Sequence, residues 1–246
     1  MGNRNTILIV GASGATGQQV VEQLLKREQK LRVIVRSPDK VPQHWHTNTN
    51  IEIIGATLLE LSDAQMLNYV GDCHAIISCL GHNLSRKGMY GQPRKLVTKA
   101  VQRLTNAVIA TKPEQALRYI LMNTTGNRNR DLKEPISLAQ KCVILLLRCL
   151  LPPHLDNELA AEYLRSQFGQ NHALVEWVAV RPDTLIDEDK VSDYSLYASP
   201  TRSALFNAGK TSRINVAHFM CELACTTNLW EQWKGQMPVI YNVEKE

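Results

Sequence analysis

The feature that most constrains this chain is a turn near its amino end in which glycine recurs every third residue, Gly11-Ala-Ser-Gly14-Ala-Thr-Gly17. The turn follows residues 7–10, an apolar run typical of a strand buried on both faces. It leads into residues 16–26, where apolar side chains recur at helical spacing. Glycine permits a tight turn and a close approach of the backbone to a phosphate, which the first N–H groups of the helix then face. The segment therefore predicts a strand–turn–helix unit that binds the pyrophosphate of a dinucleotide.

The end of the second predicted strand, residues 31–35, carries a cation at the position that selects the cofactor. A site for NAD(H) places Asp or Glu there, because a carboxylate accepts hydrogen bonds from the ribose hydroxyls. This chain has Arg36, which falls 19 residues after Gly17 and is followed by Ser37 and Lys40. A guanidinium forms paired hydrogen bonds with a phosphate. The sequence thus favours NADP(H) over NAD(H), with a solvated Arg36 as the alternative.

Strand-like and helix-like segments alternate along the chain, which predicts an α/β fold of Rossmann type, a doubly wound parallel sheet with helices on both faces. Further strands are predicted at residues 51–54, 74–80, 119–123, 175–180 and 239–243. Further helices are predicted at residues 62–69, 94–110, 138–151, 156–167 and 216–226. Ser62 and Asp156 are the predicted N-caps of two of them, and Pro152-Pro153 is predicted to end the helix 138–151. We expect a single domain over residues 1–246, in which residues from about 185 to 246 add a small substrate-side lobe.

Composition and charge exclude several classes of protein. Hydrophobic residues make up 44% of the chain and charged residues 21%, as in globular proteins. The net charge is +5 but Lys and Arg form no run of five or more, so no nucleic-acid partner is predicted. The apolar stretch 142–151 is interrupted by Arg148 and is too short to span a bilayer. We expect no signal peptide before the first strand. The six cysteines include no Cys-x-x-Cys pair, so we expect reduced thiols, no metal site and a cytoplasmic protein.

Five segments occur in an order that resembles a known family: the glycine turn, Val35-Arg-Ser-Pro-Asp-Lys40, Cys79-Leu-Gly81, Asn123-Thr-Thr-Gly126 and Val180-Arg-Pro182. Over nearly its whole length the chain resembles the atypical short-chain dehydrogenases/reductases of the NmrA-like group. The segment Leu80-Gly-His-Asn83 and residues 209–220 resemble the flavin and biliverdin reductases within that group. The resemblance implies a Rossmann fold that binds NAD(P).

The resemblance also implies a set of contacts with the cofactor. Thr124 and Thr125 would lie near the nicotinamide, and the backbone of Pro182-Asp-Thr184 would hold its amide group. His82, at the carboxyl end of the fourth strand, is a further candidate for contact with an acceptor. The family often has an acid after the third strand, where this chain has Gly55-Ala-Thr-Leu58. The predicted cofactor-binding residues are Gly11, Ser13, Gly14, Ala15, Thr16, Gly17, Arg36, Ser37, Leu58, Cys79, Leu80, Gly81, Thr124, Pro182, Asp183 and Thr184.

The expected catalytic helix departs from the pattern of the wider superfamily. Ordinary members donate a proton from the tyrosine of a Tyr-x-x-x-Lys pair, whose lysine lowers the tyrosine pKa. Here that helix reads Asp156-Asn-Glu-Leu-Ala-Ala-Glu162, and we expect no such catalytic pair. Hydride transfer without it suits an acceptor that can take its proton from water. The resemblance therefore implies an NADPH-dependent oxidoreductase acting on a flavin or similar planar small molecule, and the alternative is a non-enzymatic NADP(H)-sensing regulator with a protein partner.

Overall fold

The first strand, β1 (Thr6–Val10), lies inside a sheet and pairs in parallel with β2 (Lys30–Val35) on one side and β4 (Cys73–Ser78) on the other. The computed structural model describes residues 4–82, 91–132, 134, 143, 146, 148, 151–204 and 206–243. From β1 the chain adds β2 and then β3 on one side, and it next places β4 on the other side of β1. The strand order therefore reverses between β1 and β4. In open α/β sheets a ligand binds outside the carboxyl ends of the strands at such a reversal.

Within the described residues the main sheet has eight strands in the order β3-β2-β1-β4-β5-β6-β10-β8. Every neighbouring pair is parallel except β10 and β8, which are antiparallel. The strands not yet given bounds are β3 (Ile51–Gly55), β5 (Leu117–Met122), β6 (Val175–Pro182), β8 (Tyr194–Tyr197) and β10 (Val239–Asn242). The predicted doubly wound parallel sheet is thus confirmed.

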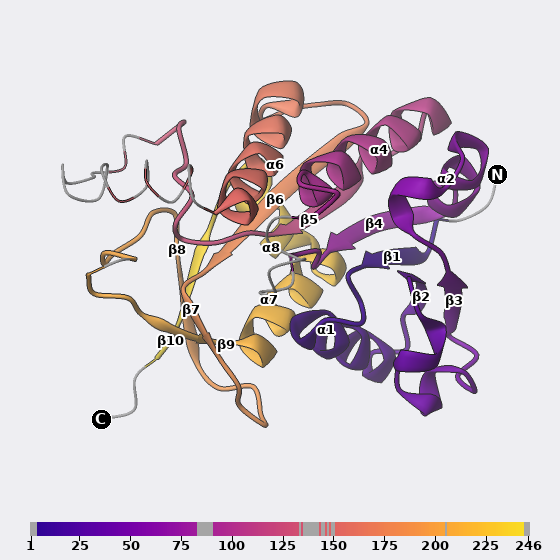
Figure 1. Ribbon diagram of the computed structural model, residues 1–246, viewed down its shortest axis with the longest axis horizontal. Helices are drawn as coiled ribbons and strands as arrows, with labels where there is room; N and C mark the ends of the chain where they lie inside the picture. Colours follow the sequence, from indigo (N-terminus) through magenta and orange to yellow (C-terminus); the bar gives the residue numbers. More distant parts are fainter. Residues whose placement is uncertain are drawn as a thin grey trace.

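Helices cover both faces of the sheet (Figure 1). One layer holds α1 (Ala15–Lys26), α7 (Arg213–Cys225) and α8 (Thr227–Trp233), and the other holds α2 (Asp63–Val70), α4 (Leu96–Thr111) and α6 (Pro152–Phe168). Successive side chains of β1 point to opposite faces of the sheet and so contribute to the hydrophobic core on each face. Ile7 and Ile9 pack toward α1 and α7, while Leu8 and Val10 pack toward α4. All four side chains are buried, so the strand that carries the glycine turn is held from both sides.

Short elements complete the architecture. Three 3-10 turns follow β2 and β3, namely η1 (Pro38–Lys40), η2 (Gln43–Trp45) and η3 (Leu58–Glu60). A separate two-stranded ribbon pairs β7 (Thr184–Ile186) with β9 (Lys210–Ser212). After residue 185, β8 and β10 extend the main sheet, and α7 packs on α1. Only the ribbon and its loops in this part of the described chain lie outside the main sheet and its helix layers. In the part of the chain described, no helix is both long and apolar enough to cross a membrane.

Two predictions at one helix boundary were wrong. Pro152 and Pro153 occupy the first turn of α6 and begin a helix, since proline lacks an N–H that this turn would leave unbonded and its φ is preset for a helix. Asp156 lies inside α6 and is buried, so it does not cap its own helix. Ser62 does cap α2, as predicted: its hydroxyl accepts from the N–H of Gln65, and its own N–H donates to the Gln65 side chain. The predicted helix 138–151 falls mostly outside the described residues.

Candidate functional site

The glycine turn is shaped by close backbone packing. Gly11 has a φ of +79°, and a Cβ there would lie 2.5 Å from the carbonyl carbon of Cys79. A Cβ on Gly17 would lie 2.1 Å from the carbonyl oxygen of Gly11. Both contacts are with backbone, which cannot rotate away, so neither position accepts a side chain. The absence of a side chain at Gly17 thus lets the start of α1 pack closely against the turn.

The start of α1 has neither a side-chain cap nor an acidic residue. Gly14 is its N-cap. Ser13, Gly14 and Ala15 are exposed, whereas Thr16 is buried beneath them. The first N–H groups of a helix carry partial positive charge and need acceptors. Here no side chain caps those groups, and they lie at the point where the strand order reverses.

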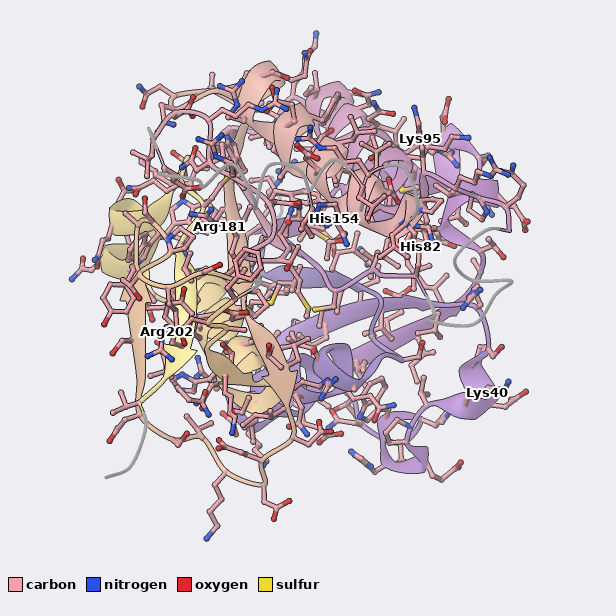
Figure 2. The ribbon with its side chains drawn as sticks, turned by 60° about the vertical axis from the view of Figure 1, so that its left-hand side comes forward. Lys40, His82, Lys95, His154, Arg181 and Arg202 are labelled. Carbon is pink, nitrogen blue, oxygen red and sulfur yellow. The ribbon has the colours of Figure 1, made fainter. Side chains whose placement is uncertain are left out.

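Cationic and small polar groups follow β2. Arg36 and Ser37 are exposed, and Lys40 ends the following turn, projecting at the edge of the molecule in Figure 2. The turn rests on the end of β3, because a Cβ on Gly55 would lie 2.7 Å from Cγ of Pro38. Leu58, one of the predicted cofactor-binding residues, is 7% exposed and packs in the core. Any contact it makes with a ligand therefore involves its backbone or a small edge of its side chain.

The carboxyl end of β4 lies directly beneath the glycine turn. The N–H of Cys79 donates to the carbonyl oxygen of Val10 at 2.9 Å. Burial raises the pKa of the Cys79 thiol to about 12, so the thiol is protonated at neutral pH. Leu80 is half-buried, and Gly81 is exposed with nothing within 4 Å of the position of a Cβ. The predicted segment thus offers backbone and open space to a ligand.

The carboxyl end of β5 is fixed to its neighbours by its own polar groups. The side chain of Asn123 donates to the carbonyl oxygen of Asn157 on α6 at 3.1 Å and accepts from the N–H of Thr124 at 2.8 Å. The N–H of Thr125 donates to the carbonyl oxygen of Pro182 at 3.0 Å. The structure therefore brings Thr124 and Thr125 to the same edge as the end of β6, with Thr124 half-buried and Thr125 buried.

At the end of β6 the backbone donors are already engaged. Pro182 has no N–H, and the N–H of Thr184 donates to the Asp183 carboxylate at 2.9 Å and to the carbonyl oxygen of Gly209 at 3.2 Å. The Asp183 carboxylate also accepts from the N–H of Gly209 at 2.9 Å. Burial raises the pKa of Asp183 above its usual value, against the bonds it accepts. Residues 182–184 can therefore offer a ligand their carbonyl oxygens and side chains, whereas the backbone N–H of Thr184 is already hydrogen-bonded within the protein.

A buried ion pair supports this edge and was missed by the sequence analysis. Arg181 is fully buried and donates to both carboxylate oxygens of Glu134, at 2.8 and 3.1 Å. Its other bonds reach the carbonyl oxygens of Met237, Asn127 and Ala198. One side chain thus joins β6 to the loop after β5, the segment before β10 and the loop after β8. The Val180-Arg-Pro182 motif includes Arg181, but no feature of the neighbouring sequence identifies Glu134 as its partner.

A second buried cluster explains where Asp156 points. Its carboxylate accepts from the backbone N–H groups of Val97 and Thr98 at 2.7 and 3.0 Å, and from the Thr98 hydroxyl at 2.6 Å. Asp156 therefore caps α4 from another helix. Nε2 of His82 lies 2.8 Å from the same carboxylate, and its side chain is 4% exposed. This nitrogen of His82, a candidate for contact with an acceptor, is thus engaged with Asp156 and ties the end of β4 to α4 and α6.

The spacing Tyr-x-x-x-Lys does occur in the chain at Tyr241 and Lys245, away from the helix on which the catalytic pair is usual. Tyr241 lies on strand β10, where residues four apart do not share a helical face, and Lys245 is outside the described residues. Burial raises the pKa of Tyr241, the reverse of what an activated proton donor needs. On α6, where the pair is usual, Asp156 faces α4 and both Ala160 and Ala161 are buried.

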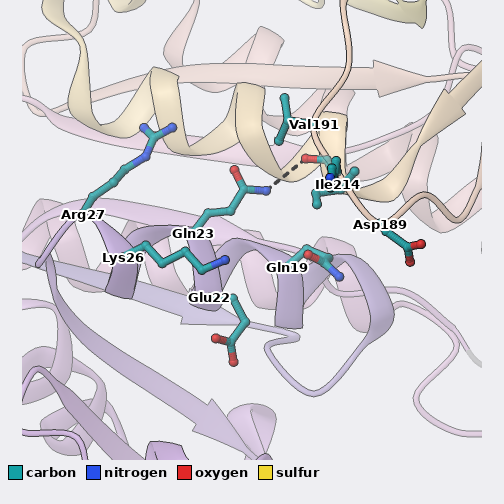
Figure 3. A pocket seen from close by; sticks show the side chains of 9 residues that line it. Gln19, Glu22, Gln23, Lys26, Arg27, Asp189, Val191 and Ile214 are labelled. Atoms are coloured by element: carbon teal, nitrogen blue, oxygen red, sulfur yellow. Dashed lines mark hydrogen bonds between the residues drawn. The ribbon is translucent and has the colours of Figure 1, made fainter.

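A surface groove of about 350 Å³ lies elsewhere, between α1 and the residues around the start of α7 (Figure 3). Gln23 crosses it and donates to the carbonyl oxygen of Ile214 at 3.0 Å. Charges of both signs line it, including Glu22, Lys26 and Asp189. None of the predicted cofactor residues is among its lining residues. The groove is therefore separate from the site at the strand ends.

The sequence model of a family described as NAD(P)H-binding matches residues 11–226. The chain belongs to this NAD(P)H-binding family. The match begins at the first glycine of the turn and runs through α7, so it includes all the strand ends described above. A search among curated proteins finds no significant match.

Solved structures share the fold at low sequence identity. ChuY, an anaerobilin reductase from Escherichia coli, is 16% identical with a TM-score of 0.66, covering 98% of this chain and 98% of its own. A protein from Streptococcus pneumoniae proposed to be an NADH-flavin reductase has the same identity and TM-score over 97% and 99%. A short-chain dehydrogenase/reductase from Veillonella parvula in complex with NADP is 12% identical, with a TM-score of 0.67 over 97% and 94%. At these identities the likeness shows the Rossmann fold.

Proposed function

We propose that this chain is an NADPH-dependent reductase that passes hydride to a flavin or a similar planar small molecule. The observation that carries the proposal is the pairing of an uncapped helix start at Gly14 with a cation, Arg36, at the end of the neighbouring strand. The helix start suits the pyrophosphate and the guanidinium suits a 2′-phosphate. The reductases among the structural neighbours add support for this class of reaction.

The reaction balances without a protein acid. When bound, NADPH supplies a hydride, and the acceptor takes that hydride together with one proton from water, leaving NADP⁺ and the reduced acceptor. The protein's part is to orient the two partners and to exclude bulk water from between them. We propose that Thr124 and Pro182–Thr184 border the nicotinamide, that the mechanism uses no Tyr–Lys pair, and that residues 1–246 act as one cytoplasmic domain.

The test is steady-state oxidation of NADPH with excess FMN, beside direct titration of NADPH binding by its fluorescence. Arg36→Ala should weaken NADPH binding roughly 10- to 100-fold, the worth of a charge-assisted hydrogen bond, and should leave NADH binding nearly unchanged. Lys30→Ala is the matched control, since it removes an exposed cation from the opposite end of the same strand. Equal loss in both variants, or equal loss for NADH, would overturn the assignment of Arg36.

Turnover separates the reductase from the regulator. FMN-dependent oxidation of NADPH by the unmodified chain supports the reductase. Tight NADPH binding with no turnover on FMN or on a quinone excludes this reductase activity, and it supports a cofactor-binding regulator instead. Failure to bind either NADPH or NADH would contradict both.

A further inference from the structure

The loop between β3 and α2, residues 56–61, lies beside the turn that follows β2. It contains η3, and we call it the η3 loop. The N–H of Ala56 donates to the carbonyl oxygen of Val35, the last residue of β2, at 2.9 Å. A Cβ on Gly55 would lie 2.7 Å from Cγ of Pro38. The η3 loop is therefore in contact with the segment that carries the cofactor-selecting position.

The order of the strands relates this loop to the cofactor. The sheet runs β3-β2-β1, so the end of β2 lies between the glycine turn and the η3 loop. In a Rossmann fold the pyrophosphate lies at the turn after the first strand, and the ribose of the adenosine lies at the end of the second. The adenine is attached to that ribose. We therefore expect the adenine at the ends of β2 and β3, with the η3 loop as its outer wall.

One arginine from α4 holds the carbonyl groups of the η3 loop. Nη1 of Arg103 donates to the carbonyl oxygen of Leu59 at 2.7 Å and to that of Leu58 at 3.4 Å. Its Nη2 donates to the carbonyl oxygen of Leu61 and, at 3.2 Å, to the carboxylate of Asp63. α4 lies beside α2 in the same layer, which brings the guanidinium to the loop that precedes α2 (Figure 1). The planar fork of a guanidinium suits several acceptors at once, whereas an ammonium group is a point charge.

These bonds matter because few others hold the backbone of the loop. Within the described residues, its other backbone hydrogen bonds are the one to β2 and one from the N–H of Glu60 to the carbonyl oxygen of Thr57. No side chain caps η3. Leu58 and Leu61 bury their side chains in the core, which fixes the depth of the loop. Arg103 fixes the direction of the carbonyl groups from one leucine to the other.

The ion pair with Asp63 does not account for the position of Arg103. The Asp63 side chain is 98% exposed, whereas that of Arg103 is 25% exposed. A pair with so solvated a partner contributes little to stability. The three carbonyl oxygens are therefore the partners that matter. Both terminal nitrogens of Arg103 donate to them, so Arg103 acts on a nucleotide through the loop and not by contact.

We propose that Arg103 is a positioning residue for the adenosine half of the cofactor, because it holds the η3 loop in the conformation that receives the adenine. This inference rests on the proposed binding of NADPH and adds the residue that controls its adenine side. Without the guanidinium the loop samples several conformations, and the affinity falls by the fraction that is competent to bind. A competent fraction of about one tenth raises the Kd of a nucleotide that contains adenosine about 10-fold.

The experiment measures the binding of 2′,5′-ADP, the adenosine half of NADPH without its nicotinamide, by isothermal titration calorimetry. Arg103→Met keeps an unbranched stem on α4 but removes every donor, and it should raise the Kd for 2′,5′-ADP and for NADPH about 10-fold. Arg103→Lys keeps the charge without the fork and should recover only part of the affinity. At saturating NADPH, kcat and KM for FMN should stay within about 2-fold, because the acceptor does not contact the η3 loop. Asp63→Asn is the matched control, since it removes the exposed ion pair and keeps the three carbonyl bonds.

Titrations are made at a temperature at which circular dichroism shows each variant to be folded, so lower stability alone leaves Kd unchanged. An unchanged Kd for 2′,5′-ADP in Arg103→Met, full affinity in Arg103→Lys, or an equal loss in Asp63→Asn overturns the role of Arg103. A rise in KM for FMN as large as the rise in Kd also overturns it, because the loss is then general. If Arg103→Met does not fold, Arg103→Lys decides alone.

The proposed function and this inference fail in different ways. NADPH binding without turnover on FMN refutes the reductase, and the 2′,5′-ADP titration still decides about Arg103. Turnover that persists with unchanged affinity in Arg103→Met refutes the role of Arg103 and leaves the reductase standing. A chain that binds neither NADPH nor 2′,5′-ADP contradicts both.

Discussion

At the scale of single residues, Gly17 carries the most severe steric constraint in the glycine turn. A Cβ there would lie 2.1 Å from the carbonyl oxygen of Gly11, and both groups belong to backbone held by buried strand and helix. Gly17→Ala should therefore lower the free energy of unfolding by about 3 kcal/mol, at the upper end of overpacking costs. Urea unfolding followed by circular dichroism measures this.

The matched variant is Gly81→Ala, since a Cβ at that position has nothing within 4 Å. It should leave the unfolding midpoint nearly unchanged. Equal loss of stability in the two variants would mean that the contact between Gly17 and Gly11 is not what disfavours a side chain. Because Gly81 lies at the proposed cofactor edge, stability and not NADPH affinity is the informative readout for this pair.

The residues of the site differ in how far the sequence could predict them. The spacing of Gly11, Gly14 and Gly17 follows from local backbone geometry, so the shape of the turn could be predicted. The environment of Arg181 could not, because its partners belong to residues 127, 134, 198 and 237, far apart along the chain.

At the scale of secondary-structure elements, Asp156 joins three of them. Its buried carboxylate accepts hydrogen bonds from the first turn of α4 and lies 2.8 Å from Nε2 of His82 beyond β4. Asp156→Ala leaves these donors buried without a partner, and it should cost about 3–5 kcal/mol of stability. Asp156→Asn keeps one oxygen acceptor and should cost less. Thermal and urea unfolding of the two variants measure the difference, and a loss below 1 kcal/mol for the alanine variant would contradict this role.

Asp156 also shows why helix boundaries are hard to predict from sequence. An aspartate that follows two prolines fits the pattern of an N-cap, so Asp156 was predicted to cap its own helix. The carboxylate instead caps the start of α4, 58 residues earlier in the chain. Capping requires only an acceptor within hydrogen-bond distance of the first N–H groups, so a side chain from another element can supply it. Ser62 was predicted correctly because both bonds of its capping box are local.

At the scale of the whole molecule, the parallel sheet was predictable and its far edge was not. Continuous apolar strands such as β1 indicate burial on both faces, and their alternation with helices indicates parallel pairing. β8 is short, only partly buried and antiparallel, so it lacks that signature. The ribbon of β7 and β9 has three residues in each strand, too few for any periodicity to appear.

The dependence of stability on pH also belongs to the whole molecule, because three histidines in different parts of the fold act in the same direction. Burial is the main cause that lowers the pKa values of His74, His154 and His218 from 6.5. Between the folded pKa values and 6.5 the unfolded chain binds more protons than the folded one. The stability contributed by the neutral rings is therefore present above pH 6.5 and is lost as the pH falls below it. The free energy of unfolding should fall between pH 7.5 and pH 5.5.

His74→Leu isolates one of these contributions. His74 lies on β4, and the charge of Arg118 on β5 further lowers its pKa. Its Nδ1 is buried without a partner among the described residues, so leucine should cost little at pH 7.5 and should reduce the loss of stability on going to pH 5.5. Urea unfolding at pH 7.5, 6.5 and 5.5 measures the slope for both proteins. An unchanged slope would mean that the proton uptake of unfolding in this range comes from groups other than His74.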